Sequence, residues 1–202
     1  MIIRDQDPSK NQAALRAVLG DIPTRAHGTP HPVMDIDEVL RVLQLSEIAG
    51  IPVVVDGGWG VDALLGWQTR EHADLDLALN HQHLPRLLKL LSRLGYQHLP
   101  RNDEWEHNFV LEDELGHQVD LHTFIQDETG QVVGGVKYPR ESLQGRGKIM
   151  HLKVTCVPPE WSLQFHTGYP LDETDYRDMR YLCNLYSLKL PEAYARFESK
   201  GA

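Results

Sequence analysis

The sequence predicts an α/β (α+β) fold, with a mixed β-sheet flanked by helices and a helical C-terminal part. Apolar residues at helical spacing alternate with short β-branched runs in the first half of the chain, which is typical of helices layered on a sheet. After residue 158 the apolar spacing is helical alone. The length of 202 residues suits one domain with a sizeable core, or one domain with a small appendage.

Helices are expected where apolar residues recur at spacings of three and four. Their ranges are 9–19, 35–49, 59–65, 84–94, 158–165 and 172–188. Ser9 and Asp172 suit N-caps, and Asp175 stands at the third position of the last helix. Strands are expected at 51–55, 75–79, 108–111 and 118–124, with shorter strands within 130–157. Residues 21–32 are rich in proline and glycine and are expected to form a loop or linker.

The composition favours a cytoplasmic protein without a general nucleic-acid surface. The formal net charge is -9, and such a field repels the phosphate backbone of DNA or RNA and suits a cationic small substrate better. No run approaches the roughly 18 apolar residues of a membrane span, and the N-terminus lacks the apolar core of a signal peptide. Cys156 and Cys183 lie far apart in apolar contexts, so two buried free thiols are expected.

Asp74 and Asp76 are the first candidates for chemistry. Residues two apart in a strand point to the same face, so both carboxylates share a face while Leu75 points the other way. Adjacent carboxylates repel unless a cation lies between them, and Mg²⁺ typically binds one or two carboxylates together with substrate phosphate oxygens. Alone, the pair fits a solvated acidic edge strand better than a metal site.

Asp120 and His122 share the polar face of an otherwise apolar strand. If this strand neighbours the one that carries Asp74 and Asp76, a third carboxylate joins the pair. Three carboxylates suit a two-metal centre, in which ions about 3.5–4 Å apart hold an attacking and a leaving oxygen. Asp120 can also accept the proton of an attacking hydroxyl. The alternative is the exposed face of a hairpin.

Gly57 and Gly58 stand at a strand-to-helix turn. Glycine lets the backbone approach a phosphate, and a helix N-terminus offers free N–H groups and the positive end of the helix dipole. Thr69 and Arg70 precede the carboxylate strand, and a guanidinium can hold a triphosphate by bidentate hydrogen bonds. His72 can orient a carboxylate or a phosphate, although histidine is a poor Mg²⁺ ligand. The alternatives are a tight turn, an ion pair with a neighbouring acid and a structural histidine.

Together these residues resemble the antibiotic nucleotidyltransferases of the polymerase-β-like superfamily. The resemblance rests on DGGWGVDALLG at residues 56–66, QTREH at 68–72 and DLD at 74–76, in this order. The small lincosamide nucleotidyltransferases are most similar, followed by the aminoglycoside nucleotidyltransferases. VDLH at 119–122 is similar to the strand of the third carboxylate, and HTGY at 166–169 also resembles this branch. The resemblance covers residues 34–188, which leaves 1–33 as an N-terminal extension and 189–202 as a C-terminal tail.

The resemblance implies a small nucleotidyltransferase core that converts ATP and a hydroxyl compound into an adenylylated product and pyrophosphate. Asp74 and Asp76 would bind Mg²⁺, expected as two ions, and Asp120 would act as general base and as a further ligand. The residues that would bind the nucleotide are Gly57, Gly58, Thr69 and Arg70. The supporting residues would be His72 and His122. This chemistry needs metal, positioning and a base, and no covalent nucleophile.

The acceptor stays open between several classes. A lincosamide is the first expectation, and an aminoglycoside, which the acidic net charge favours, is the second. A toxin-type enzyme acting on a protein or tRNA is the third, with the low basic content against tRNA. A catalytically silent nucleotide-binding protein is the fourth, although clustered acids are costly without a metal. A homodimer is also open, with Trp105 and Trp161 among the aromatic residues for its interface, but no heptad pattern is present.

Overall fold

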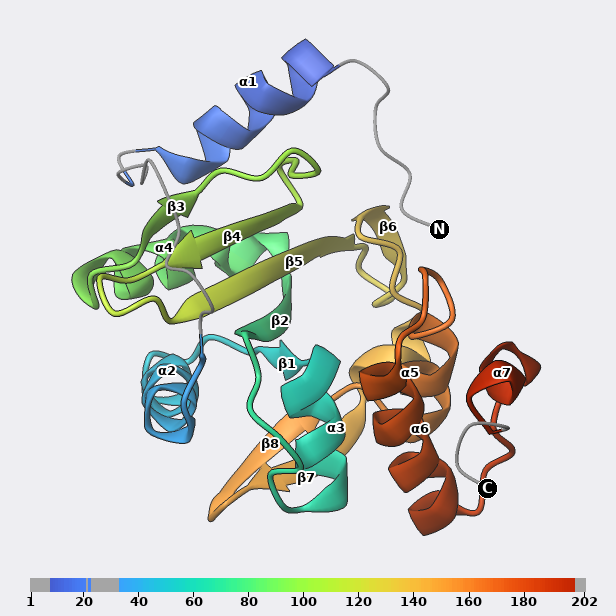
Figure 1. The fold of residues 1–202 in the computed structure, drawn as a ribbon. Helices are drawn as coiled ribbons and strands as arrows, with labels where there is room; N and C mark the ends of the chain where they lie inside the picture. Colours follow the sequence, from blue (N-terminus) through green and yellow to red (C-terminus); the bar gives the residue numbers. More distant parts are fainter. Residues whose placement is uncertain (1–7, 21, 23–32, 199–202) are drawn as a thin grey trace.

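The computed structural model describes residues 8–20, 22 and 33–198, and these form a mixed sheet with helices around it (Figure 1). The strands follow the order β3-β4-β5-β2-β1-β8-β7, and β6 pairs with β5. The strands are β1 Val54–Val55, β2 Asp74–Asn80, β3 Gln97–Leu99, β4 Asn108–Glu112, β5 Gln118–Gln126, β6 Val132–Gly135, β7 Gly145–Ile149 and β8 Leu152–Cys156. The α-helices are α1 Pro8–Leu19, α2 Ile36–Ile48, α3 Gly57–Leu65, α4 Leu84–Arg93, α5 Pro159–Phe165, α6 Glu173–Tyr186 and α7 Ala195–Glu198. Short 3-10 helices are η1 His81–His83, η2 Arg140–Leu143 and η3 Glu192–Tyr194.

The pairing of the strands confirms the predicted mixed sheet. The strands β2 and β5 are parallel, as are β1 and β8. The other pairs among the described strands are antiparallel, including β4 and β5. The parallel pair β2 and β5 lies in the middle of the sheet and carries the predicted carboxylates.

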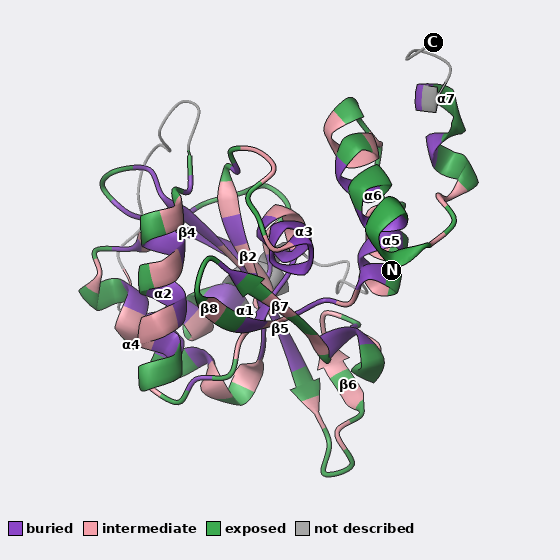
Figure 2. Ribbon diagram, turned by 90° about the horizontal axis from the view of Figure 1, so that it is seen from below, coloured by how far each residue is buried: buried purple, intermediate pink, exposed green. Residues whose placement is uncertain are grey.

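The helices pack in two groups. The helix α2 contacts α4, whereas α3 contacts α5 and α6. Figure 1 shows α5, α6 and α7 gathered at one end of the molecule, so the C-terminal part is helical as predicted. Figure 2 shows that α3 is buried along nearly its whole length. One large apolar core includes Leu15 of α1 and Phe197 of α7, so both ends of the described chain pack against the central domain.

Most predicted elements form, with differences that have local causes. The helix α6 begins with the capping box expected from Asp172 and Asp175, each of whose side chains bonds the other's backbone N–H. The strand predicted at 51–55 shrinks to β1, since Pro52 has no N–H to donate and the N–H of Ile51 bonds the end of α2. The helix predicted at 59–65 begins two residues earlier, because Asp56 caps it. The strand β3 was not predicted, and the loop predicted at 21–32 lies almost entirely outside the described residues.

The environment of the cysteines and tryptophans is now visible. Cys156 and Cys183 are buried free thiols, as predicted. Trp105 is 5% exposed and its ring contacts His107, so it is unsuited to the interface for which it was considered. Trp161 is partly buried against a smaller apolar core and contacts Phe165, and the homodimer stays a prediction. No helix in the described part of the chain is long and apolar enough to span a bilayer.

Candidate active site

The parallel pairing of β2 and β5 brings the predicted carboxylates together. Asp76 stands opposite Asp120 in the register of the two strands, and Asp74 lies two residues before Asp76 on the same face. We call Asp74, Asp76 and Asp120 the carboxylate cluster. Ligand atoms of Asp76, Asp120 and His122 all lie within 4.8 Å of one another. The condition on which the third carboxylate depended, that its strand neighbours the first, is therefore met.

The carboxylate cluster is electrostatically crowded. Burial and the charge of Asp120 raise the pKa of Asp74. Burial and the charges of Asp74 and Asp120 raise the pKa of Asp76 well above its usual value. Burial and mutual repulsion both disfavour the ionised carboxylates, and a divalent cation bound by their oxygen atoms would offset both effects. The oxygen atoms of these three carboxylates therefore fit a hard divalent cation such as Mg²⁺.

His122 adds a positive charge beside the carboxylate cluster. Its Nε2 lies 3.3 Å from Asp120 Oδ1, and the same oxygen accepts a hydrogen bond from Asn108 Nδ2 at 3.3 Å. Burial lowers the pKa of His122, but the charges of Asp120, Asp76 and Asp56 outweigh burial and raise it to about 10. The side chains of His122 and Asp120 are 20% and 23% exposed, so a ligand can reach them.

The pair Gly57 and Gly58, which we call the phosphate turn, packs directly on the site. Gly57 has φ +55, and a Cβ added to it would lie 1.9 Å from Asp76 Oδ2. A Cβ added to Gly58 would lie 2.2 Å from His72 Nδ1. The first turn of α3 therefore touches the carboxylate face at a distance that only glycine allows. By helix geometry the amides of Gly58 and Trp59 lack an intrahelical acceptor, so they suit a phosphate.

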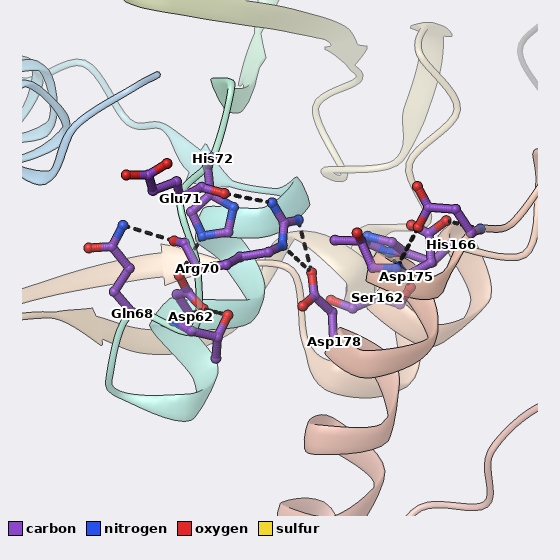
Figure 3. Close-up of polar contacts among 12 residues, drawn as sticks. Asp62, Gln68, Arg70, Glu71, His72, Ser162, His166, Asp175 and Asp178 are labelled. Carbon is purple, nitrogen blue, oxygen red and sulfur yellow. Dashed lines mark hydrogen bonds and ion pairs between the residues drawn. The ribbon is translucent and has the colours of Figure 1, made fainter. Parts of the chain in front are cut away.

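Arg70 lies beside the phosphate turn and is held by α6. Its Nε and Nη2 donate to Oδ2 of Asp178 at 3.0 and 2.9 Å, and its Nη1 donates to the carbonyl of Glu71 at 3.0 Å. Figure 3 shows its side chain reaching from the segment after α3 across to Asp178. A guanidinium has five N–H donors, so two remain without a partner among the described residues. Arg70 can thus bind a phosphate without leaving Asp178.

Asp62 organises the predicted Thr69 and His72. Its Oδ1 accepts from the N–H and the hydroxyl of Thr69 at 3.1 and 2.6 Å, and its Oδ2 lies 2.5 Å from His72 Nε2. The other ring nitrogen, His72 Nδ1, is buried, faces Gly58 and has no partner among the described residues. Thr69 is therefore bound to a helix residue, and its nucleotide contact stays a prediction.

Comparison with known proteins places this geometry in a family. A model of the Aminoglycoside-2''-adenylyltransferase family matches residues 38–182. The chain belongs to this family. A lincosamide resistance protein of Staphylococcus haemolyticus is 31% identical over 154 residues, which are 72% of this chain and 92% of that protein. A 2''-aminoglycoside nucleotidyltransferase of Escherichia coli is 31% identical over 77 residues, 37% of this chain and 42% of that protein.

A solved structure shares the fold as well. The crystal structure of the lincosamide antibiotic adenylyltransferase LnuA, with lincomycin bound, matches with a TM-score of 0.66 and 28% identity. The match covers 74% of this chain and 97% of that chain. The resemblance stated from the motifs is confirmed, and the chain is a nucleotidyltransferase.

The structure gathers almost all predicted site residues around one place, and the role of each stays a prediction. These residues are Gly57, Gly58, Arg70, His72, Asp74, Asp76, Asp120 and His122. Sequence reasoning missed Asp56, Asp62 and Asp178 as parts of the site. Asp62 had a signal, an acid inside an otherwise apolar helix. Asp178 had none, because it meets Arg70 across 108 residues of chain.

Proposed function

We propose that the protein transfers the adenylyl group of ATP to a hydroxyl of a lincosamide antibiotic in a Mg²⁺-dependent, in-line displacement. The pairing of Asp76 with Asp120 beside the phosphate turn carries the reaction class. The lincosamide acceptor is supported by the share of each relative that this chain matches. The lincosamide resistance protein matches over 92% of its length, whereas the aminoglycoside enzyme of Escherichia coli matches over 42%.

The residues of the site divide the work of such a transfer. Two Mg²⁺ ions, held by the carboxylate cluster, would neutralise the triphosphate and the charge that develops during displacement. Gly57 and Gly58 would let the backbone approach the phosphates, and the two free donors of Arg70 would bind phosphate oxygens. Together these contacts would align the α-phosphorus with the acceptor.

Asp120 would act as the general base. The acceptor hydroxyl gives its proton to the Asp120 carboxylate while its oxygen bonds the α-phosphorus. The bond between the α-phosphorus and the bridging oxygen breaks, and pyrophosphate leaves with that electron pair. The exposure of the Asp120 side chain, 23%, lets an acceptor reach it. His122 would keep the base in place from the next position on the same face.

A mass-shift screen tests the proposal. The protein is incubated with ATP, Mg²⁺ and a panel that includes lincomycin and tobramycin, and the products are examined for an added AMP. We expect the gain on lincosamides, its loss on chelation with EDTA and its loss in Asp74→Ala and Asp120→Asn. Asp37→Asn, which changes an exposed carboxylate on α2, is the control that keeps activity. Full activity of Asp74→Ala would refute the metal assignment.

An aminoglycoside acceptor is the second candidate, and the family model together with the net charge of -9 favours it. The same screen separates the two, because an AMP gain on tobramycin alone would replace the lincosamide assignment. No gain on any antibiotic would move the assignment to a macromolecular acceptor or to a silent nucleotide-binding protein. Parallel reactions with GTP in place of ATP test the nucleotide preference.

Since ATP is the proposed donor, we expect the enzyme to act in the cytoplasm.

A further inference from the structure

Tyr138, in the segment between β6 and η2, connects two parts of the site that are far apart in the sequence. Its hydroxyl donates to Asp56 Oδ2 at 2.9 Å, and its oxygen lies 3.1 Å from His122 Nδ1. At one end, Asp56 Oδ1 accepts the N–H of Gly57 at 2.9 Å. At the other end, His122 Nε2 lies 3.3 Å from Asp120 Oδ1. A continuous set of hydrogen bonds thus runs from the phosphate turn to the third carboxylate.

The donors and acceptors of this set are fixed by simple counting. Burial and the charge of Asp56 raise the pKa of Tyr138 well above its usual value, so the phenol keeps its proton and donates its one hydrogen bond to Asp56. A phenol has only one hydrogen, so His122 Nδ1 must donate to the Tyr138 oxygen. The ring is then held with Nε2 toward Asp120. This resembles the way in which outer groups orient histidines at metal sites.

The aromatic ring of Tyr138 does not need the hydroxyl for its packing. It is 5% exposed and lies edge-on to Phe124 and Phe165, with ring centroids 6.0 and 5.7 Å away. A phenylalanine would keep these contacts and lose only the connection between Asp56 and His122. The hydroxyl can therefore be tested separately from the ring.

We propose that Tyr138 is a positioning residue, whose hydroxyl holds the phosphate turn and the third carboxylate at the spacing that adenylyl transfer requires. The proposal deepens the function proposed above and rests on it for the identity of the reaction. Without the hydroxyl, the His122 ring can rotate beside Asp120, while the side chain of Asp56 keeps only its bond to the Gly57 N–H. Neither Tyr138 nor Asp56 would touch the substrate.

The chain offers a matched control in Tyr96. It is buried, 1% exposed, and its hydroxyl donates to a carboxylate, Glu38 Oε1, at 3.1 Å. Glu38 belongs to α2 and to none of the contacts of the site described above. Tyr96→Phe therefore measures the general cost of losing a buried hydroxyl-to-carboxylate hydrogen bond, and Tyr138→Phe adds the effect on the site.

The experiment compares wild type, Tyr138→Phe and Tyr96→Phe. We expect similar losses of stability in urea unfolding, and a kcat that falls about 10–100-fold in Tyr138→Phe alone, as for other outer groups of metal sites. The KM of the acceptor should hardly change, and the Mg²⁺ concentration for half-maximal rate should rise. Equal kcat values in the two variants, or a Tyr138→Phe chain that no longer folds while Tyr96→Phe does, would overturn the positioning role.

The failure of the proposed function would give a different result. If wild type modifies no acceptor, turnover is replaced by calorimetric binding of a non-hydrolysable ATP analogue with Mg²⁺. Binding about tenfold weaker in Tyr138→Phe than in Tyr96→Phe would then support the link. Equal binding in both variants, or none in wild type, would overturn it.

Discussion

Replacing Gly57 by alanine tests how closely the phosphate turn approaches the carboxylate cluster, the proposed metal site. The added Cβ would stand 1.9 Å from Asp76 Oδ2, and real Cβ contacts are essentially never found below 3.0 Å. The two atoms must therefore separate by about 1 Å or more, by movement of the turn or of the carboxylate. Either movement changes the geometry of the site, because Asp76 is a proposed metal ligand.

The expected loss of unfolding free energy in Gly57→Ala has two separate contributions. At φ +55 an alanine costs about 1–2 kcal/mol relative to glycine, since the left-handed region is unfavourable for L-residues. The overlap with Asp76 adds about 1–3 kcal/mol if the surroundings are forced to move. If Asp76 turns aside instead, the second cost falls but the ligand is misplaced, and a displacement of about 1 Å can reduce activity about 100-fold.

Gly50 supplies the control. It also has a positive φ, +62, but the described atoms leave a Cβ free space of at least 4 Å there. Gly50→Ala should therefore lose only about 1–2 kcal/mol of unfolding free energy and keep its kcat. Urea unfolding followed by tryptophan fluorescence and a pyrophosphate-release assay measure both quantities. Wild-type kcat in Gly57→Ala, with no more loss of stability than in Gly50→Ala, would refute the close approach.

Three further outcomes are expected. Burial and neighbouring charges raise the pKa of Asp76, so its ionisation weakens the metal-free fold as the pH rises above about 3.8. In EDTA at neutral pH, Asp76→Asn should therefore have a higher Tm than wild type, and it should have no activity. A lower Tm in Asp76→Asn would contradict this reasoning. Arg70→Lys loses the fork that holds Asp178, so the KM for ATP should rise about tenfold or more with the acceptor KM unchanged, and an unchanged ATP KM would count against the phosphate contact. Burial lowers the pKa of His117, but two aspartates outweigh it and raise the value above 6.5, so its stabilising charge is complete below that pH and lost as the pH rises through the raised value. His117→Gln should therefore lower the Tm more at about pH 6 than at about pH 9, and equal losses would exclude this charge effect.

Local patterns account for the parts of the fold that the sequence predicted. Helices α2, α4 and α6 have apolar residues at helical spacing. In strands β2 and β5, polar and apolar residues alternate along much of the strand, as expected for a strand with one face more polar than the other. The strand β3 escaped prediction because Gln97 and His98 have no strong strand preference, and its pairing with β4 creates it. The early start of α3 depended on one cap, Asp56, whose side chain bonds the first amide of the helix.

In the site too, local patterns predict some residues, and tertiary contacts bring in the others. The carboxylates of β2 could be predicted because two residues of one strand share a face, and a third joined them once the neighbouring strand was assumed. Asp178 and Tyr138 could not be predicted, since each reaches the site only through tertiary packing. The bond of Tyr138 to Asp56 spans 82 residues, and no short motif records such a contact.

Several features that cost folding free energy lie where a nucleotide would bind. The carboxylate cluster has raised pKa values at Asp74 and Asp76, and His72 Nδ1 and Asp178 Oδ1 are buried without a partner among the described residues. An unpaired buried polar atom costs about 1–3 kcal/mol, so this region weakens the fold. By contrast, the buried pair Asp113 and His117, which lies outside the site, is held by hydrogen bonds on both side chains. Bound Mg²⁺ would supply the positive charge that offsets the repulsion among the carboxylates, so its binding would stabilise the fold through these side chains.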